Sequence, residues 1–557
     1  MNRLSWLLAL LWAGSAFGAS QAVGSKAAVA TVSPYSTRVG LSVLRDGGNA
    51  IDAAVAISFA LTVAHPQAGN IGGGGFLIYY EAATRSTWAL DYREIAPIRA
   101  TRNMYLGPDG KVRDQASTVG GLATAVPGSV AGLEEMHKRF GSLKWNLLVA
   151  PAIALSKEGF ATDEKLTANL AGAKKDRQID RFPLTASTFY PNGEPVAAGT
   201  LLKQPLLART LEEISWYGAS GFYRGANAKR ILAAMKKHDG IITAQDLEEY
   251  RPTWRAPIRI NYGEFEFHTM PPPSAGSIIF TEVLGILSGY DVRSFGFQTP
   301  RMVHLLSEAE RRAYVDRNRY LGDPEVTRIP YAELFGEARA RQWRASIDLQ
   351  RATPTATLDR TQDAQTGQTT HFSVVDSSGN VASVTTTLNS FFGNGVMVEE
   401  GGYFLNNEMD DFTTAPGKAT SYGLVQSEAN AIAPKKKMAS SMCPTIIMKA
   451  GSPWLVFGSP GGSTIPTTLL QVFFNVTVFG KTLRESVESP RFHHQGYPDE
   501  IAFEKGRVDA KFLTKLNELG HAVKEWETIG DVHAILVEDD VLTAVSDSRR
   551  GGAAGAF

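Results

Sequence analysis

Two adjacent threonines, Thr369 and Thr370, stand where a polar, turn-prone segment (361–367) gives way to a strongly strand-like one. A threonine hydroxyl is a weak nucleophile on its own and needs a base to take its proton. A cut between Gln368 and Thr369 would supply that base, since an unperturbed α-amino group has a pKa of about 7.7–8.0. The junction therefore predicts nucleophilic chemistry that begins only after cleavage, although a Thr-Thr pair also opens ordinary β-strands.

A second hydroxyl is expected beside the first. Residues 376–380 form a turn signal between two alternating segments, which is typical of a β-hairpin. Pairing that is symmetric about Ser378 places Thr387 opposite Thr369, with Cβ atoms about 4.5–5.5 Å apart. A slip of one residue would bring a neighbour of Thr387 to that place instead.

Two further segments carry groups that could bind or activate a substrate. Residues 406–412 hold three acidic and two amide side chains, which could receive an ammonium group or form a polar turn. They lack the spacing and the distal glutamate of an EF-hand. Residues 458–463 lie between a predicted strand and a predicted helix, where backbone N–H groups can stabilise an oxyanion. Because the Gly-X-Ser-X-Gly elbow is absent from this position, a conventional serine hydrolase is less well supported.

The elements that must position these groups indicate a layered α/β protein. An alanine-rich helix that begins after Asn49 is expected to be buried nearly all round. Amphipathic helices are predicted over 206–217, 226–237 and 302–320, and another helix over 464–478. Short strands are predicted over 76–80, 370–375, 381–388, 445–448, 453–457 and 534–537. Residues 351–368 are typical of an exposed linker that tolerates cutting.

Composition excludes several other classes of function. The 557 residues include 56 basic and 56 acidic side chains, so the net charge of zero gives no sign of a nucleic-acid partner. The single cysteine, Cys443, permits no intrachain disulfide and is expected in the core. No histidine cluster with metal spacing is apparent, so metal catalysis is not predicted.

The N-terminus is typical of a secretory signal peptide. Asn2 and Arg3 supply a positive start and residues 4–13 are apolar. Ala16 and Gly18 place small residues at the −3 and −1 positions for cleavage before Ala19. We therefore predict a signal peptide over 1–18 and export to the periplasm or the outside. The alternative is an N-terminal segment that is retained as a membrane anchor; no later stretch is typical of a membrane span.

Taken together, the motifs resemble those of the gamma-glutamyltranspeptidase (glutathione hydrolase) family of N-terminal-nucleophile hydrolases. The matching segments are 48–54, 65–76, 91–97, 127–132, 270–273, 369–376, 405–412, 440–442, 458–463 and 549–552. The resemblance implies a four-layer αββα fold that two chains form jointly after one precursor is cut. The large chain would span 19–368 and the small chain 369–557, and the two would form a heterodimer without a cofactor.

The resemblance also implies a role for each site residue. Thr369 would cut the Gln368–Thr369 bond and then serve as the catalytic nucleophile, with Thr387 hydrogen-bonded to it. Arg93, Ser440 and Ser441 would bind the donor's α-carboxylate, and Asn389, Glu408 and Asp411 its α-amino group. The N–H groups of Gly461 and Gly462 would form the oxyanion hole. Residues 413–429, with Tyr422, resemble a lid loop.

The expected reaction is transfer of a γ-glutamyl group from glutathione or a related amide, through a Thr369 ester, to water, an amino acid or a dipeptide. Two alternatives remain open on the sequence. One is a cephalosporin or glutaryl acylase built on the same fold. Such an enzyme does not require an α-amino group on its donor. The other is an exported binding protein whose site is catalytically inactive.

Overall fold

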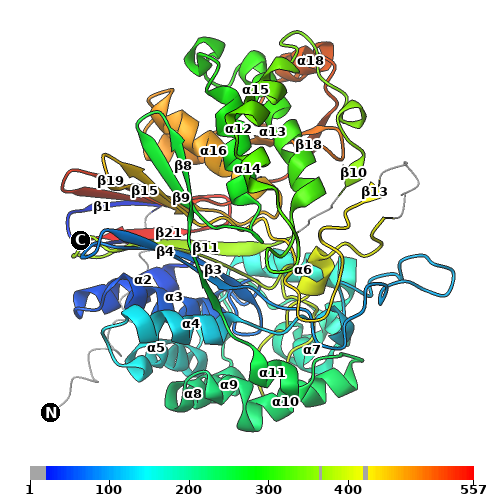
Figure 1. Ribbon diagram of the computed structural model, residues 1–557. Coiled ribbons are helices and arrows are strands. Elements are labelled where there is room, and N and C mark those ends of the chain that lie inside the picture. The colour runs from blue at the N-terminus through cyan, green and yellow to red at the C-terminus, as the bar shows by residue number, and fades with distance from the viewer. Residues whose placement is uncertain (1–19, 363–366, 418–424) are drawn as a thin grey trace.

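The computed structural model describes residues 20–362, 367–417 and 425–557. Two seven-stranded antiparallel sheets face one another at its centre, and helices cover the outer face of each (Figure 1). The first sheet has the order β21 (Ala553–Ala556), β2 (Ala28–Thr31), β11 (Thr369–Val375), β12 (Val381–Thr387), β3 (Gly74–Glu81), β4 (Ser86–Tyr92), β7 (Thr253–Arg255). The second sheet has the order β1 (Gln21–Gly24), β20 (Val541–Ser546), β19 (His533–Glu538), β15 (Ser452–Gly458), β14 (Thr445–Lys449), β9 (Phe265–Thr269), β8 (Ile258–Tyr262). This arrangement confirms the predicted layered α/β class.

Each outer layer consists of helices that bury an apolar face on a sheet. The first sheet is covered by α2 (Pro34–Arg45), α3 (Ala50–Ala64) and α4 (Ser129–Phe140), and α5 (Trp145–Glu158) packs on α3. The second is covered by α12 (Gly276–Leu287) and α16 (Thr464–Thr477), and α13 (Pro300–Tyr320) packs on α12. Further helices extend the two layers: α6 (Glu164–Arg177), α7 (Pro183–Phe189), α8 (Pro205–Tyr217), α9 (Ser220–Tyr223), α10 (Gly225–Lys237), α11 (Ala244–Glu249), α14 (Tyr331–Leu334), α15 (Glu337–Ala345), α17 (Leu483–Glu488) and α18 (Ala510–Glu518).

Within the described ranges, three small sheets lie outside the central pair. The strands β16 (Phe492–His493), β17 (Ile501–Glu504) and β18 (Val523–Trp526) form one of them. The others pair β5 (Phe160–Ala161) with β6 (Leu201–Leu202) and β10 (Thr361–Gln362) with β13 (Val425–Gln426). Within the described part of the chain, no helix is long and apolar enough to cross a membrane. The predicted signal peptide, 1–18, lies outside the described residues.

Helix α3 shows how the sequence sets this architecture. The Asn49 side chain accepts hydrogen bonds from the N–H groups of Ile51 and Asp52, and the Asp52 side chain accepts from Asn49 in return. This capping box fixes where the helix begins. From Ala50 to Val63 every residue is buried, because α2 and α5 flank the helix and the first sheet lies against it. The prediction of a helix buried nearly all round is confirmed.

The hairpin of β11 and β12 has the predicted register. Thr369 pairs with Thr387, and the pairing continues without a slip to Val375 and Val381. Both strands are buried along their whole length, because the second sheet covers one face and α3 the other. A central position in the sheet leaves neither strand free to shift its register.

The expectation of an exposed linker before the junction is only partly correct. Thr355 is fully buried at the start of a 3₁₀ turn (Thr355–Thr357). Its hydroxyl accepts from Arg311 at 2.6 Å, and its N–H donates to Asp499 Oδ2 at 2.7 Å. These polar anchors come from distant segments, so local composition did not indicate them. Residues 363–366 lie outside the described part of the chain.

Candidate functional site

Thr369 and Thr387 lie side by side at one end of the central hairpin, both buried. The Thr387 hydroxyl accepts a hydrogen bond from the N–H of Asn389 at 2.8 Å and donates its own proton to the carbonyl oxygen of Gln368 at 3.1 Å. That carbonyl belongs to the Gln368–Thr369 peptide bond. The structure therefore places a hydrogen-bond donor on the carbonyl group that a nucleophile at Thr369 would attack.

The residues before Thr369 lie against the glycine turn of the second sheet. A Cβ atom on Gly462 would lie 2.9 Å from the N atom of Gly367, so only glycine permits this approach. Gly462 also has a φ of 57°, and Gly461 a φ of 128°. Both angles favour glycine, and so the sequence Gly461-Gly462 is required by the turn as well as by the close approach.

The turn is held rigidly at the start of α16. The Tyr314 hydroxyl donates to the carbonyl oxygen of Ser463, and the Ser463 hydroxyl donates to Gln495. Thr464 closes the turn from the other side by donating to the carbonyl oxygen of Gly461 at 2.9 Å. A helix N-terminus carries unpaired N–H groups and a partial positive charge. The turn is thus suited to stabilise negative charge that develops near Thr369.

A small pocket opens beside Thr369 and brings together most of the predicted site residues. It is lined by Arg93, Gly367, Thr369, Thr387, Asn389, Asp411, Ser440, Ser441, Met442, Gly462 and Ile465. Three predicted residues that the structure describes do not line it, and one of them, Gln368, directly precedes Thr369. Glu408 lies behind Arg93 with its carboxylate fully buried, and Gly461 lies in the turn next to Gly462. Tyr422, the predicted lid residue, lies outside the described residues.

Arg93 follows β4 directly and is buried, with 1 % of its surface exposed. Its N–H donates to Asp91, and its carbonyl oxygen accepts from the Tyr250 hydroxyl at 2.9 Å. The guanidinium contacts Glu408 at 2.6 Å and Asp411 at 2.5 Å. Burial alone would lower the pKa of Arg93, but these carboxylates and Glu94 outweigh it and raise that pKa. Arg93 is therefore a permanent cation in the wall of the pocket.

The acids around Arg93 outnumber it. Burial raises the pKa of Glu408 to about 8, although Arg93 lowers it, and burial also raises the pKa of Asp411 well above its usual value. Glu94, 3.5 Å from Arg93, has its pKa raised to about 8 for the same reason. One cation thus faces three carboxyl groups. A second cation, such as an ammonium group on a ligand, would be stabilised here.

This charge balance predicts a pH dependence of ligand binding. Glu408 is protonated below about pH 8 and ionised above it, and only the ionised form attracts an ammonium group. The affinity for a non-reacting γ-glutamyl analogue is therefore expected to increase as the pH rises from about 6 to about 8.5. Glu408→Gln is expected to reduce that increase, while Glu94, whose pKa is also raised to about 8, keeps part of it. An inhibition constant measured across this range tests the prediction, and an unchanged profile in the variant would contradict it.

Ser440 and Ser441 reach the pocket through a loop held by the proline-rich segment. Ser440 donates its N–H to the carbonyl oxygen of Pro273 at 2.8 Å and accepts from the N–H of Ala275 at 2.7 Å. Ser274 Oγ donates to the carbonyl oxygen of Met442 at 2.8 Å. The Ala439 carbonyl oxygen, directly before Ser440, accepts from Arg93 at 3.0 Å. The serine hydroxyls and the guanidinium therefore share one wall of the pocket.

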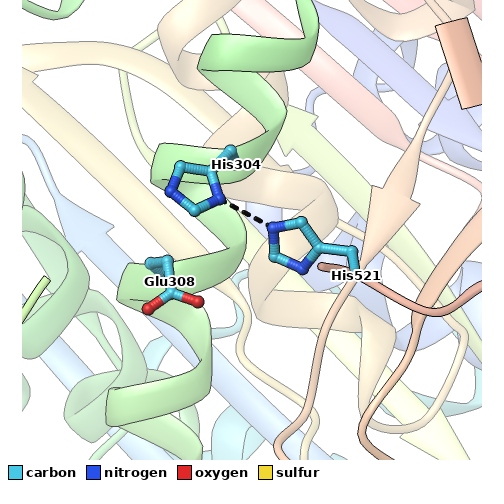
Figure 2. Close-up of side chains that lie close together, drawn as sticks. All are labelled: His304, Glu308 and His521. Carbon is cyan, nitrogen blue, oxygen red and sulfur yellow. Dashed lines mark hydrogen bonds between the residues drawn. The ribbon is translucent and has the colours of Figure 1, made fainter. Parts of the chain in front are cut away.

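A cluster of His304, Glu308 and His521 escaped the sequence analysis (Figure 2). His304 and Glu308 have i, i+4 spacing within the predicted helix 302–320, but His521 is distant in sequence. His304 Nε2 donates to a carbonyl oxygen at 2.8 Å, and its Nδ1 shares a 2.7 Å hydrogen bond with Nε2 of His521. Burial and, to a smaller extent, His304 lower the pKa of His521 to about 3. His521 is therefore neutral near pH 7.

Glu308 of this cluster is fully engaged by other groups. Its carboxylate accepts from Arg311 at 3.2 Å, from Arg312 at 2.7 Å and from the hydroxyl of Thr353 at 2.6 Å. The two guanidinium groups would repel a metal cation, and the imidazoles already bond to each other. Among the described residues this is the one group whose geometry could hold a metal ion, and its chemistry is that of a packing cluster.

Comparisons with known proteins place this layered fold among the gamma-glutamyltransferases and hydrolases, with N-terminal-nucleophile hydrolases as its structural neighbours. The family model for gamma-glutamyltranspeptidase matches residues 36–557. Glutathione hydrolase proenzyme of Escherichia coli strain K12 is 40% identical over 524 residues, which cover 94% of this chain and 90% of that protein. The chain belongs to the gamma-glutamyltranspeptidase family.

Solved structures agree with this assignment. Cephalosporin acylase from Bacillus halodurans superposes with a TM-score of 0.84 at 25% identity and covers 98% of both chains. Gamma-glutamyltranspeptidase from Helicobacter pylori has a TM-score of 0.56 at 39% identity, covering 58% of this chain and 92% of that one. The acylase likeness shows that the fold alone does not decide the acyl group.

Proposed function

We propose that this chain is a γ-glutamyl acyltransferase and glutathione hydrolase that matures by cutting its own Gln368–Thr369 bond. The observation that carries the proposal is the Thr387 hydroxyl, which donates to the Gln368 carbonyl oxygen directly before Thr369. The family match and the names of the relatives, which include a proenzyme, support it. The roles of the site residues below are part of this proposal.

Self-cleavage begins with attack of the Thr369 hydroxyl oxygen on the Gln368 carbonyl carbon. A C–O bond forms, the C–N bond breaks, and the hydroxyl proton passes to the nitrogen, which becomes the free α-amino group of Thr369. Thr387 stabilises the negative charge on the carbonyl oxygen during the attack. Water then hydrolyses the ester, leaving a carboxyl group on Gln368 and restoring the Thr369 hydroxyl.

The two products are expected to stay together. The strands β11 and β12, after the cut, pair with β2 and β3, before it, and β14 pairs with β9 in the second sheet. Both sheets therefore contain strands from each product. Separation would expose the apolar surface between the sheets to water. We infer a stable heterodimer of 19–368 and 369–557 that is exported from the cell.

In the mature enzyme the free α-amino group of Thr369 takes the proton of its own hydroxyl. The oxygen attacks the γ-carbonyl of the donor, the leaving amine takes that proton, and a γ-glutamyl ester forms on Thr369. Gly461 and Gly462 offer N–H groups to the oxyanion, while Arg93, Ser440 and Ser441 hold the α-carboxylate. Asn389, Glu408 and Asp411 surround the α-ammonium. Water or an acceptor amine then releases the glutamyl group.

A substrate comparison tests the assignment of the acyl group. Hydrolysis of γ-glutamyl-p-nitroanilide is compared with hydrolysis of a glutaryl-cephalosporin, whose acyl group lacks the α-amino group. Because Glu408 and Asp411 place two carboxyl groups beside Arg93 that could pair with the donor's α-ammonium, and a glutaryl group has no ammonium to pair with them, the γ-glutamyl substrate is expected to have a kcat/KM at least about a hundredfold higher. A preference for the glutaryl substrate would show an acylase, and loss of both activities would show an inactive binding protein.

Thr387→Val is expected to slow self-cleavage by about a hundredfold, because valine keeps the shape but removes the donor to the Gln368 carbonyl. The rate is measured as fragment appearance on a denaturing gel. Thr370→Val is a matched control: the Thr370 hydroxyl is buried and has no hydrogen-bond partner among the described residues. Equal rates for the two variants would contradict the role of Thr387.

A further inference from the structure

Gln368, the residue before the proposed cut, is held at three points. Its N–H donates to the carbonyl oxygen of Asn389, and its carbonyl oxygen accepts from Thr387 at 3.1 Å. Its side-chain Oε1 accepts from Nη2 of Arg550 at 2.7 Å. The first two contacts fix the peptide bond itself. The third involves a side chain that the chemistry of bond cleavage does not require.

Arg550 is itself fixed by its surroundings. Its N–H donates to Asp531 Oδ1 at 3.1 Å, and its guanidinium carbon lies 5.3 Å from the centre of the Phe391 ring. Its Nη1 atom is buried and has no hydrogen-bond partner within the described ranges. A guanidinium group only donates, so the atom of Gln368 that it meets must be the amide oxygen.

The loop that contains Gly530 and Asp531, to which the N–H of Arg550 donates, also supports the glycine turn of the active site. The N–H of Asp531 donates to the Ser459 hydroxyl at 2.8 Å. A Cβ atom on Gly461 would lie 3.4 Å from the Cα atom of Gly530. The loop with Asp531 therefore contacts both Arg550, which binds the Gln368 side chain, and the turn that carries the proposed oxyanion donors. Arg550 thus fixes the position of Gln368 relative to that turn.

We propose that Arg550 is a positioning residue for self-cleavage, which acts by holding the amide oxygen of Gln368. This inference rests on the proposed function. Fixing the side chain restricts rotation of the Gln368 backbone, so that the carbonyl oxygen stays on Thr387 and the carbonyl carbon faces Thr369. The chain thereby favours a residue with an acceptor oxygen at position 368. The bonds that form and break are those of the proposed cleavage.

Two single variants and their combination test this inference. Gln368→Met and Arg550→Met are each expected to slow cleavage by about tenfold or more, because a hydrogen bond to a charged group is lost. The cleavage rate of the double variant is expected to be within about threefold of that of the slower single variant, because both changes remove the same hydrogen bond. Gln368→Glu is expected to be cut at least as fast as the unchanged chain, since a carboxylate offers two acceptors to the guanidinium fork.

Cleavage is followed in chains made by cell-free translation, as the appearance of two fragments over time. Arg549→Met is the matched control, because the neighbouring Arg549 contacts Glu504 at 2.5 Å and Asp547 at 3.0 Å. A purely structural arginine acts independently of residue 368, so the effects of Arg549→Met and Gln368→Met are expected to multiply.

The inference is wrong if Gln368→Met is cut as fast as the unchanged chain, or if its effect multiplies with that of Arg550→Met. If Arg550→Met does not fold, the rates of Gln368→Met and Gln368→Glu decide alone. An unchanged chain that is never cut would overturn the proposed function together with this inference. A normally cut unchanged chain with an equally fast Gln368→Met would overturn only the inference.

Discussion

Thr369→Ala is expected to leave the chain in one piece and to lower γ-glutamyl transfer by at least about a thousandfold. Alanine removes the oxygen that attacks Gln368, and the same oxygen carries the γ-glutamyl group in the mature enzyme. The fold should persist, because Thr369 is one buried residue at the end of a strand whose backbone pairing with Thr387 does not depend on its side chain. A denaturing gel and a γ-glutamyl-p-nitroanilide assay measure the two losses.

Thr369→Ser is the informative comparison, because serine keeps the hydroxyl and loses only the methyl group. This variant is expected to be cut and to be active, with a lower rate. Cleavage of Thr369→Ala at the usual position, or full activity in it, would show that another residue supplies the nucleophile. Circular dichroism of the uncut variant separates lost chemistry from lost structure.

Arg93→Gln is expected to have the second largest effect, by weakening donor binding and lowering kcat/KM about a hundredfold or more. Glutamine cannot pair with a donor carboxylate, and the change leaves Glu408 and Asp411 without the cation that they contact at 2.6 and 2.5 Å. Removing one partner of a buried ion pair costs about 3–5 kcal/mol of stability. Urea unfolding and steady-state kinetics measure the two consequences.

Arg255→Gln provides the control for stability alone. Arg255, on the neighbouring strand β7, pairs with Asp91 of β4 at 2.8 Å and does not line the pocket. This variant is expected to lose stability while its KM for the donor stays within about threefold of the unchanged value. An Arg93→Gln variant that keeps its KM, or an Arg255→Gln variant that loses donor binding to the same extent, would contradict the assignment of Arg93.

The parts of the fold that follow from local pattern were predictable from the sequence. The position of Thr387 opposite Thr369 follows from the turn at 376–380 and the period of a strand. The capped start of α3 follows from Asn49 and Asp52. The resemblance to the family motifs then predicted that Arg93, Asp411 and Ser441 share one site, and the structure places all three around one pocket.

Contacts between distant segments were not predictable in the same way. The burial of Thr355 depends on Asp499, and the histidine pair depends on His521, each of which reaches its partner only through the tertiary fold. Arg550 appeared in the sequence only as part of a motif. Its hydrogen bond to Gln368 becomes visible once β19, β20 and the junction are placed in space. The raised pKa values of the carboxyl groups around Arg93 likewise depend on burial, which the sequence alone does not reveal.

The most direct test of the central claim is the intact mass of the purified protein before and after brief mixing with a γ-glutamyl donor and an acid stop. We expect two chains, of which the smaller begins at Thr369 and gains the mass of one glutamyl residue during turnover. Digestion should place that mass on the peptide that begins with Thr369. A single uncut chain that nevertheless turns over the donor, or a glutamyl group found on another residue, would contradict the account.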